Sequence, residues 1–286
     1  MGDWLIVNPL DRDQLGEGPL WSARDGALYW VDILRQQLHR LHLGSGRMSF
    51  WTLPEMISWV MERQHQTGLI AGLRSGFAEL RLDPFAVRVI ARPEPDLPDN
   101  RLNDAKADSN GRIYAGSMAV SADRPTGSLY RFDADMTITR LDEGYVVANG
   151  PAFSCDGRYL YHADSALRTV FRYNVRGDGS LCERQPFIEF AQDWGLPDGM
   201  TVDANDHLWV AHWNGGRVSR FAPNGSLQKS IALPTPQVTS CTFAGDGLDR
   251  MFVTTAAVGL DADAFAGKVF EVDPCTEGLA PNAFAG

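Results

Sequence analysis

The chain has 286 residues, a formal net charge of −10 and a pI near 5.0, which excludes the basic surface that nucleic-acid binding requires. Its 44% hydrophobic residues, 28 Gly and 16 Pro are typical of a turn-rich β protein with a large core. We find neither an apolar run of membrane-spanning length nor a signal peptide, which predicts a cytoplasmic protein without a membrane partner.

The first strand-forming run, WLIVNP at 4–9, precedes a series of similar turn-then-strand units. These units read DGALYWVD at 25–32, TGLIAGL at 67–73, NGRIYAGS at 110–117, DGRYLYHAD at 156–164, NDHLWVAH at 205–212 and LDRMFVTT at 248–255. With Gly26, Gly68, Gly111, Gly157, Asp206 and Asp249 as markers, consecutive units are 42, 43, 46, 49 and 43 residues apart. Each unit is followed by another alternating run, such as LHRLHL or GSLYRF, that indicates a further strand.

Repeats of four antiparallel strands near this length are typical of β-propeller blades. Six units predict an all-β, six-bladed β-propeller that forms a single domain over residues 1–286. The sixth unit ends soon after GKVFEVDP and leaves little chain for an outer strand. We therefore expect the N-terminal run WLIVNP to supply that strand and close the ring, which removes an exposed sheet edge.

The innermost strands are expected to be GEGPLWS, ISWVMER, LNDAKAD, NGPAFSC, DGMTVDA and TSCTFAG. Polar residues at one offset in several blades should meet near the central axis. Glu17 lies nine residues before its turn marker, and Asn103, Asn149 and Asp198 each lie eight residues before theirs. Ser58 at ten residues and Ser240 at nine complete the ring less decisively.

Glu17, Asn149 and Asp198 offer two carboxylates and one amide oxygen, which suit a hard divalent cation. A structural zinc site would require Cys or His. The histidines do not share the offset, and the four widely spaced cysteines are expected to be reduced thiols. Asn149-Gly150 and Asp198-Gly199 are also ordinary turn formers. Their shared position, one repeat apart and before an apolar strand, favours a site.

A polar cluster opens the stretch RLNDAKADSNGRIYAGSM at 101–118, ahead of the Asn110-Gly111 hairpin turn. Arg101 taken alone is more often a solvated surface residue. Strand alternation predicts that Asp104 points away from Asn103 and has a structural role.

Several motifs together resemble the senescence-marker-protein, gluconolactonase and luciferin-regenerating-enzyme family. They are LGEGPLW, RLNDAKAD with GRIYAGSM, NGPAFSCDGRYLYHADS, LPDGMTVDANDHLWVAHWNGGRV and TSCTFAG, and they extend over nearly the whole chain. The resemblance implies a six-bladed propeller that holds one divalent metal ion and hydrolyses sugar lactones. It implies Glu17, Asn149 and Asp198 as metal ligands, Arg101 and Asn103 as substrate contacts, and Asp198 also as general base.

The segment SMAVSADRP departs from the family pattern. Some members carry a carboxylate that contacts substrate where this chain has Ser121, and Asp123 is a candidate to replace it. The sugar specificity is therefore left open, whereas the metal ligands are unaffected.

These observations predict a metal-dependent lactonase that opens an aldonolactone to the sugar acid. Ca²⁺ is the expected ion, with Mn²⁺, Zn²⁺, Mg²⁺ and Fe²⁺ as alternatives, and either Asp198 or a metal-bound water would activate the nucleophile. The alternatives are a non-catalytic metal-binding scaffold or sensor, and a hydrolase of other esters or organophosphates. A sugar lactone is the expected partner, and the chain is expected to be a monomer or a weak homo-oligomer.

Overall fold

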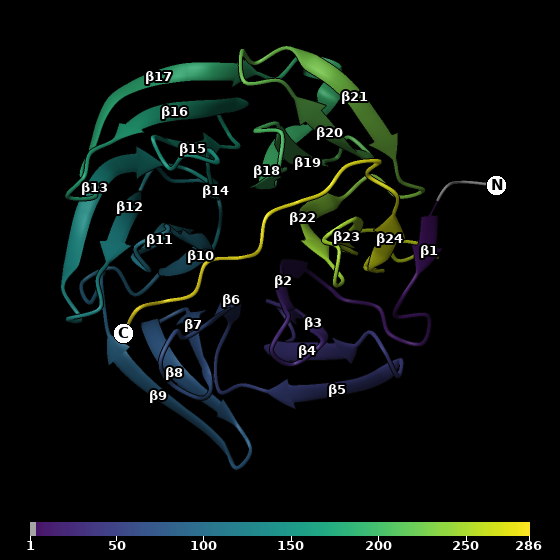
Figure 1. Ribbon diagram of the computed structural model, residues 1–286, viewed down its shortest axis with the longest axis horizontal. Helices are drawn as coiled ribbons and strands as arrows, with labels where there is room; N and C mark the ends of the chain where they lie inside the picture. Colours follow the sequence, from purple (N-terminus) through teal and green to yellow (C-terminus); the bar gives the residue numbers. More distant parts are fainter. Residues whose placement is uncertain (1–3) are drawn as a thin grey trace.

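The computed structural model describes residues 4–286 as six four-stranded antiparallel sheets around a common axis (Figure 1). In blades one to five the chain runs outward, from an inner strand beside the axis to an outer strand at the rim. The predicted six-bladed β-propeller, with four strands in each blade, is therefore confirmed. The helical structure of the described residues is a single 3-10 turn, Gln192–Trp194, and none of it is long or apolar enough to cross a membrane.

The strands of each blade follow one another in the sequence, except in the last blade. Blade one contains β2 (Gly16–Ser22), β3 (Ala27–Asp32), β4 (Gln37–His42) and β5 (Arg47–Thr52). Blade two contains β6 (Ile57–Glu62), β7 (Leu69–Leu73), β8 (Gly76–Leu82) and β9 (Phe85–Ala91). Blade three contains β10 (Asn100–Ala107), β11 (Ile113–Ala119), β12 (Gly127–Phe132) and β13 (Ile138–Tyr145).

The remaining three blades complete the ring. Blade four contains β14 (Ala148–Phe153), β15 (Tyr159–Asp164), β16 (Thr169–Val175) and β17 (Leu181–Glu189). Blade five contains β18 (Leu196–Val202), β19 (Leu208–Trp213), β20 (Arg217–Phe221) and β21 (Leu227–Ala232). Blade six contains β22 (Val238–Ala244), β23 (Arg250–Thr255) and β24 (Phe270–Val272), with β1 (Trp4–Ile6) as its outer strand.

The N-terminal strand β1 closes the ring as predicted. It pairs antiparallel with β24, with Trp4 opposite Val272. The Trp4 ring also packs edge-on against Phe265 and Phe270, with ring centroids 5.4 Å apart in both pairs. A strand from the start of the chain thus covers the edge that the last blade would otherwise expose.

The core lies between neighbouring blades. Trp59 and Ile70 from blade two form one buried cluster with Leu102 and Ile113 from blade three, because adjacent sheets press their apolar faces together. The inner strands are therefore held on both faces by other blades. This packing fixes the positions of the side chains that they direct toward the axis.

The C-terminal segment, residues 278–286, crosses the face at which the inner strands finish, which we call the lower face. Figure 1 looks onto this face, with the segment drawn in yellow across the inner strands. Gly278 bridges to Asp203 after β18, and Phe284 bridges to Arg63 after β6. The Phe284 ring is fully buried and stacks on Phe132 at 5.3 Å. The segment therefore ties blades five and six to blades two and three.

We expect deletion of residues 1–9 to lower the free energy of unfolding by on the order of several kcal/mol, because it exposes the β24 edge and removes the packing of Trp4. Thermal and urea unfolding would measure this loss. Leu5→Ala, which trims an exposed side chain on the same strand, is the control and should change stability little. A truncated protein with the parental Tm would show that β1 does not close the ring.

Candidate functional site

The strand register shifts at the same place in all six blades. The pairing of each inner strand with its neighbour is interrupted near one end, as at Glu17–Leu20 in β2 and Asn149–Ala152 in β14. The equivalent shifts in the other blades lie at Ile57–Trp59, Leu102–Ala105, Pro197–Met200 and Val238–Ser240. Such bulges re-aim side chains at a sheet edge. The residues at these shifts begin the inner strands, so they lie toward the face opposite the C-terminal segment, the upper face.

Each predicted metal ligand stands directly before a glycine inside its bulge. Gly18 after Glu17 has φ of 53°, and Gly150 after Asn149 has φ of 75°, a backbone conformation that favours glycine. A Cβ on Gly199, after Asp198, would lie 2.2 Å from the Ser240 hydroxyl. Asn149-Gly150 and Asp198-Gly199 are therefore parts of strands β14 and β18, not turns between strands.

Hydrogen bonds fix the orientation of the amide of Asn149. Its Nδ2 donates to Ser165 Oγ at 2.8 Å, and Ser165 Oγ donates to the Pro197 carbonyl at 2.6 Å. Its Oδ1 accepts from Asn103 Nδ2 at 2.6 Å. One lone pair of Oδ1 stays available because a carbonyl oxygen accepts two bonds. These hydrogen bonds connect blades three, four and five through the side-chain amide of Asn149.

Arg101 is buried beside this network. One guanidinium nitrogen donates to Asn103 Oδ1 at 2.6 Å and to the Leu102 carbonyl at 3.0 Å, with Ser58 Oγ at 3.5 Å. Burial lowers the pKa of Arg101 to about 10, while the charges of Glu17 and Asp198 raise it. Arg101 therefore stays cationic at neutral pH and faces both carboxylates.

Burial and mutual repulsion raise the pKa values of the candidate carboxylates. Burial raises the pKa of Glu17 to about 8, with a further contribution from the charge of Asp104. Burial, followed by the charges of Glu17 and Asp104, holds the pKa of Asp198 well above its usual range. Because their charges affect one another's pKa values, Glu17, Asp104 and Asp198 lie in one electrostatic environment. A positive charge among them would relieve the repulsion.

That Asp104 points away from Asn103 and has a structural role stays a prediction. The bulge between Leu102 and Ala105 breaks the alternation of β10. Asp104 Oδ1 accepts from the Ala105 amide at 2.8 Å, whereas Oδ2 is buried without a hydrogen-bond partner. Asp104 therefore acts on Glu17 and Asp198 through its charge.

The donor set suits a divalent cation that prefers oxygen. Among residues 4–286, His, Cys, Asp and Glu side chains form no group of three or more that is placed to hold a metal ion. The predicted set differs because an amide supplies one of its three donors. Glu17, Asn149 and Asp198 are all at least nine-tenths buried, and two of them are carboxylates whose pKa values are raised by burial and by neighbouring negative charge. These residues fit the ion that the sequence predicted.

Ser121 lies apart from the hydrogen-bond network of the site. It is exposed in the loop after β11, and its hydroxyl donates to Asp123. Because Asn100 pairs with Ala119 at the end of β11, this loop starts at the same end of blade three as Arg101. A substrate contact by Ser121 stays a prediction.

Sequence reasoning did not identify Ser165, and it gave Ser58 little weight. Ser58 Oγ donates to the Leu102 carbonyl at 2.5 Å and lies beside Arg101. The offset of ten residues from its turn marker was the available signal for Ser58. Ser165 follows β15 and touches the site only through Asn149 and Pro197, so no offset within the repeats would have revealed it.

Comparisons with known proteins agree with these features. A family model described as "SMP-30/Gluconolactonase/LRE-like region" matches residues 15–257. The chain is 38% identical to L-arabinolactonase of Azospirillum brasilense, covering 96% of this chain and 93% of that protein. It is 36% identical to 6-deoxy-6-sulfogluconolactonase of Pseudomonas putida, covering 95% of each. A solved calcium-binding protein, regucalcin from Agrobacterium tumefaciens, is similar at a TM-score of 0.93 with 28% identity, covering 98% of this chain and 97% of that one.

The metal-free protein should lose stability as the pH rises from about 4.5 to about 8. Glu17 has a pKa of about 8 when folded and 4.5 ordinarily, so between these values the folded chain holds a proton that the unfolded chain has lost. Because one pKa unit corresponds to about 1.4 kcal/mol, Glu17→Gln should remove a pH-dependent loss on the order of 1 kcal/mol or more.

Urea unfolding of the metal-free protein at pH 5 and pH 8 would measure this difference. Glu189→Gln, which changes an exposed glutamate on β17, is the matched control and should keep the parental pH dependence. If Glu17→Gln also keeps it, Glu17 is not the buried carboxyl that the site requires.

Proposed function

The chain belongs to the SMP-30/gluconolactonase/LRE-like family, and we propose that it is a hydrolase that opens sugar lactones to the corresponding sugar acids. The arrangement that carries this proposal is the meeting of Glu17, Asn149 and Asp198 with Arg101 and Asn103 at the bulges of the inner strands. The names of two relatives, an arabinolactonase and a sulfogluconolactonase, support the reaction class.

The residues that would hold a divalent ion are Glu17, Asn149 and Asp198. Ca²⁺ is the ion we expect, and the calcium-binding regucalcin of similar structure supports this choice. When bound, the ion would supply Lewis-acid polarisation of the ester and compensation for the buried carboxylates. The hydrogen bond from Asn149 Nδ2 to Ser165 keeps the amide oxygen, not the nitrogen, toward this position.

Arg101 and Asn103 are proposed to bind the substrate. Arg101 is a buried cation whose guanidinium has further donors for the lactone carbonyl and hydroxyls. Asn103 is held by its bonds to Arg101, Asn149 and the Ala148 carbonyl, so its amide is fixed before a substrate arrives. A metal site with a purely structural role would need no such pair beside it.

Asp198 is proposed to accept the proton of the attacking water while it also serves as a ligand. A carboxylate can fill both roles because it offers two oxygens with about four lone-pair sites. Asp198 lies in β18 with its backbone held between two blades, which fixes where the proton is received. Hydrolysis then adds water across the ring ester, and the ring oxygen leaves as the hydroxyl of the sugar acid.

Metal removal tests the proposal most simply. We expect chelation to abolish hydrolysis of a panel of pentono- and hexonolactones, followed by a pH indicator, and Ca²⁺ or Mn²⁺ to restore it. Simple esters and organophosphates in the same panel measure the alternative hydrolase activities. Full lactonase activity in protein shown to be metal-free would contradict the metal dependence. Metal binding without turnover of any lactone would favour a scaffold or sensor.

The two roles of Asp198 are separable with Asp198→Asn. This change keeps an oxygen donor but removes a charge and the ability to accept a proton, so metal affinity should fall. We expect kcat to stay about a hundredfold or more below the parent even at saturating metal, as is typical for loss of a general base. Asn149→Asp is the control, because its added charge should tighten metal binding.

A near-parental kcat for metal-saturated Asp198→Asn would remove the base assignment and leave Asp198 as a ligand alone. Steady-state kinetics across a metal titration would separate the effect on metal affinity from the effect on kcat.

A further inference from the structure

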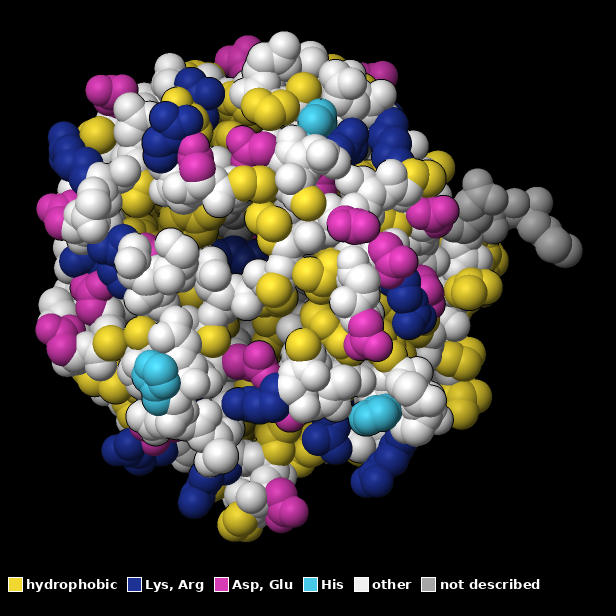
Figure 2. Space-filling model, viewed as in Figure 1, with side chains coloured by type: hydrophobic (Ala, Val, Ile, Leu, Met, Phe, Trp, Pro, Cys, Tyr) yellow, Lys and Arg dark blue, Asp and Glu magenta, His cyan; other side chains and the backbone are white. Residues whose placement is uncertain are grey.

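A cavity of about 650 Å³ opens on the lower face and extends along the inner strands as far as Gly18 and Asp104. Its walls come from the ends of the inner strands and from residues 279–282 of the C-terminal segment. Figure 2 shows this face hollowed near its centre, with a basic side chain inside the hollow. None of Glu17, Arg101, Asn149 and Asp198 lines the cavity, although it reaches Gly18, the neighbour of Glu17, and Asp104, whose charge acts on Glu17 and Asp198.

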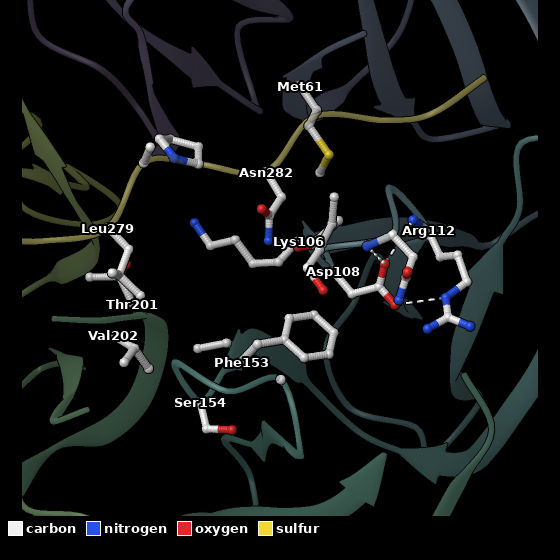
Figure 3. A pocket seen from close by; sticks show the side chains of 18 of the residues that line it. Met61, Lys106, Asp108, Arg112, Phe153, Ser154, Thr201, Val202, Leu279 and Asn282 are labelled. Atoms are coloured by element: carbon white, nitrogen blue, oxygen red, sulfur yellow. Dashed lines mark hydrogen bonds and ion pairs between the residues drawn. The ribbon is translucent and has the colours of Figure 1, made fainter. Parts of the chain in front are cut away.

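Lys106 brings a positive charge into this cavity, where it lowers the pKa values of Asp104 and Glu17 without forming an ion pair with either. It comes from β10, is half-buried, and makes no hydrogen bond or ion pair with any residue in the described range 4–286. Of the other cations in the wall, Arg112 pairs with Asp108, with Nε and Oδ2 2.7 Å apart, and Arg158 pairs with Asp156. Arg176 forms no ion pair with any residue in the described range. In Figure 3 the amine of Lys106 extends away from the Arg112–Asp108 pair, toward the side where Leu279 is drawn.

Asp104 gives the same cavity a buried oxygen without a partner. Asp104 is 7% exposed, and its Oδ2 has no hydrogen-bond donor among the described residues. A buried polar atom in this state is costly unless a ligand or water satisfies it. A hydroxyl group would donate to it, while a second negative charge would be repelled by Asp104 and Asp108.

The rest of the wall suits a small hydroxylated molecule. Thr201 and Thr242 bring hydroxyls from β18 and β22, and Asn282 brings an amide from the C-terminal segment. Asn282 also donates to the Ala107 carbonyl at 3.2 Å, which holds the segment against β10. Phe153 offers an apolar surface for a carbon chain. Lys106 without an ion pair, a carboxylate oxygen without a hydrogen bond and several hydroxyls therefore surround one space.

We propose that this cavity binds a hydroxylated monocarboxylate, with its carboxylate on Lys106 and a hydroxyl donating to Asp104. One negative charge would form an ion pair with Lys106, whereas a neutral polyol would leave Lys106 without one. A phosphate dianion would bring a second negative charge beside Asp104, Asp108 and Asp156. Sugar acids have this chemistry, and only their choice as probes rests on the proposed lactonase function.

Isothermal titration of the full-length, metal-loaded protein with gluconate and arabinonate would test this site. We expect Lys106→Met to weaken the binding event assigned to the lower cavity at least tenfold, and Lys106→Arg, which keeps the charge, to retain most of it. Lys229→Met removes a cation that contacts Trp209 and the Pro274 carbonyl outside the cavity, so it should bind as the parent does. Arg101→Ala should keep the Lys106-dependent event, because Arg101 does not line the cavity.

Parental binding by Lys106→Met would overturn the proposal, as would equal or tighter binding of arabinitol or inorganic phosphate at this site. Lysine-dependent binding of gluconate by a protein that hydrolyses no lactone would contradict the proposed function and leave the lower site intact. Lactone hydrolysis without lysine-dependent binding of gluconate would support the proposed function and contradict the lower site.

Discussion

The register shift in every inner strand is the constraint on which the candidate site depends. A regular strand would alternate its side chains between the two faces of a blade, and those faces are covered by neighbouring blades. The extra residue of each bulge turns a polar side chain out of this alternation, as at Glu17, Asn149 and Asp198. Glycine after each of these residues permits the bulge, through a positive φ at Gly18 and a close approach at Gly199. Six blades repeat one irregularity, so their polar residues meet near one axis.

Bringing these side chains together is electrostatically unfavourable, and the fold compensates for only part of this free energy. Burial and repulsion raise the pKa values of Glu17 and Asp198. Arg101 is the cation whose charge lowers these two pKa values most. The apolar packing between blades holds the carboxylates together against this repulsion. A divalent ion would supply the missing positive charge, which links metal binding to the stability of the ring centre. Farther along β10, Lys106 forms no ion pair in the described part of the chain, although its charge lowers the pKa values of Glu17 and Asp104.

The repeat spacing was sufficient to predict the blades, the inner strands and the closure by β1, because every blade must bury the same apolar faces in the same order. The offset from each turn marker also selected Glu17, Asn149 and Asp198. The break in the alternation of β10 between Leu102 and Ala105 was not predicted, since a bulge cannot be recognised from polarity alone. Ser165 and the C-terminal segment escaped prediction for another reason. Their contacts, such as those of Phe284 with Phe132 and Arg63, exist only once distant blades have been brought together by ring closure.

The central claim is that Glu17, Asn149 and Asp198 hold one divalent ion at the upper end of the propeller axis. Anomalous scattering from a crystal of the protein with bound Mn²⁺ would locate the ion without reference to activity. The account predicts one strong peak per chain, within coordination distance of an oxygen from each of these three residues. A peak beside other side chains would contradict it. The absence of a peak between these three residues, in a protein that binds the ion at full occupancy in solution, would also contradict it.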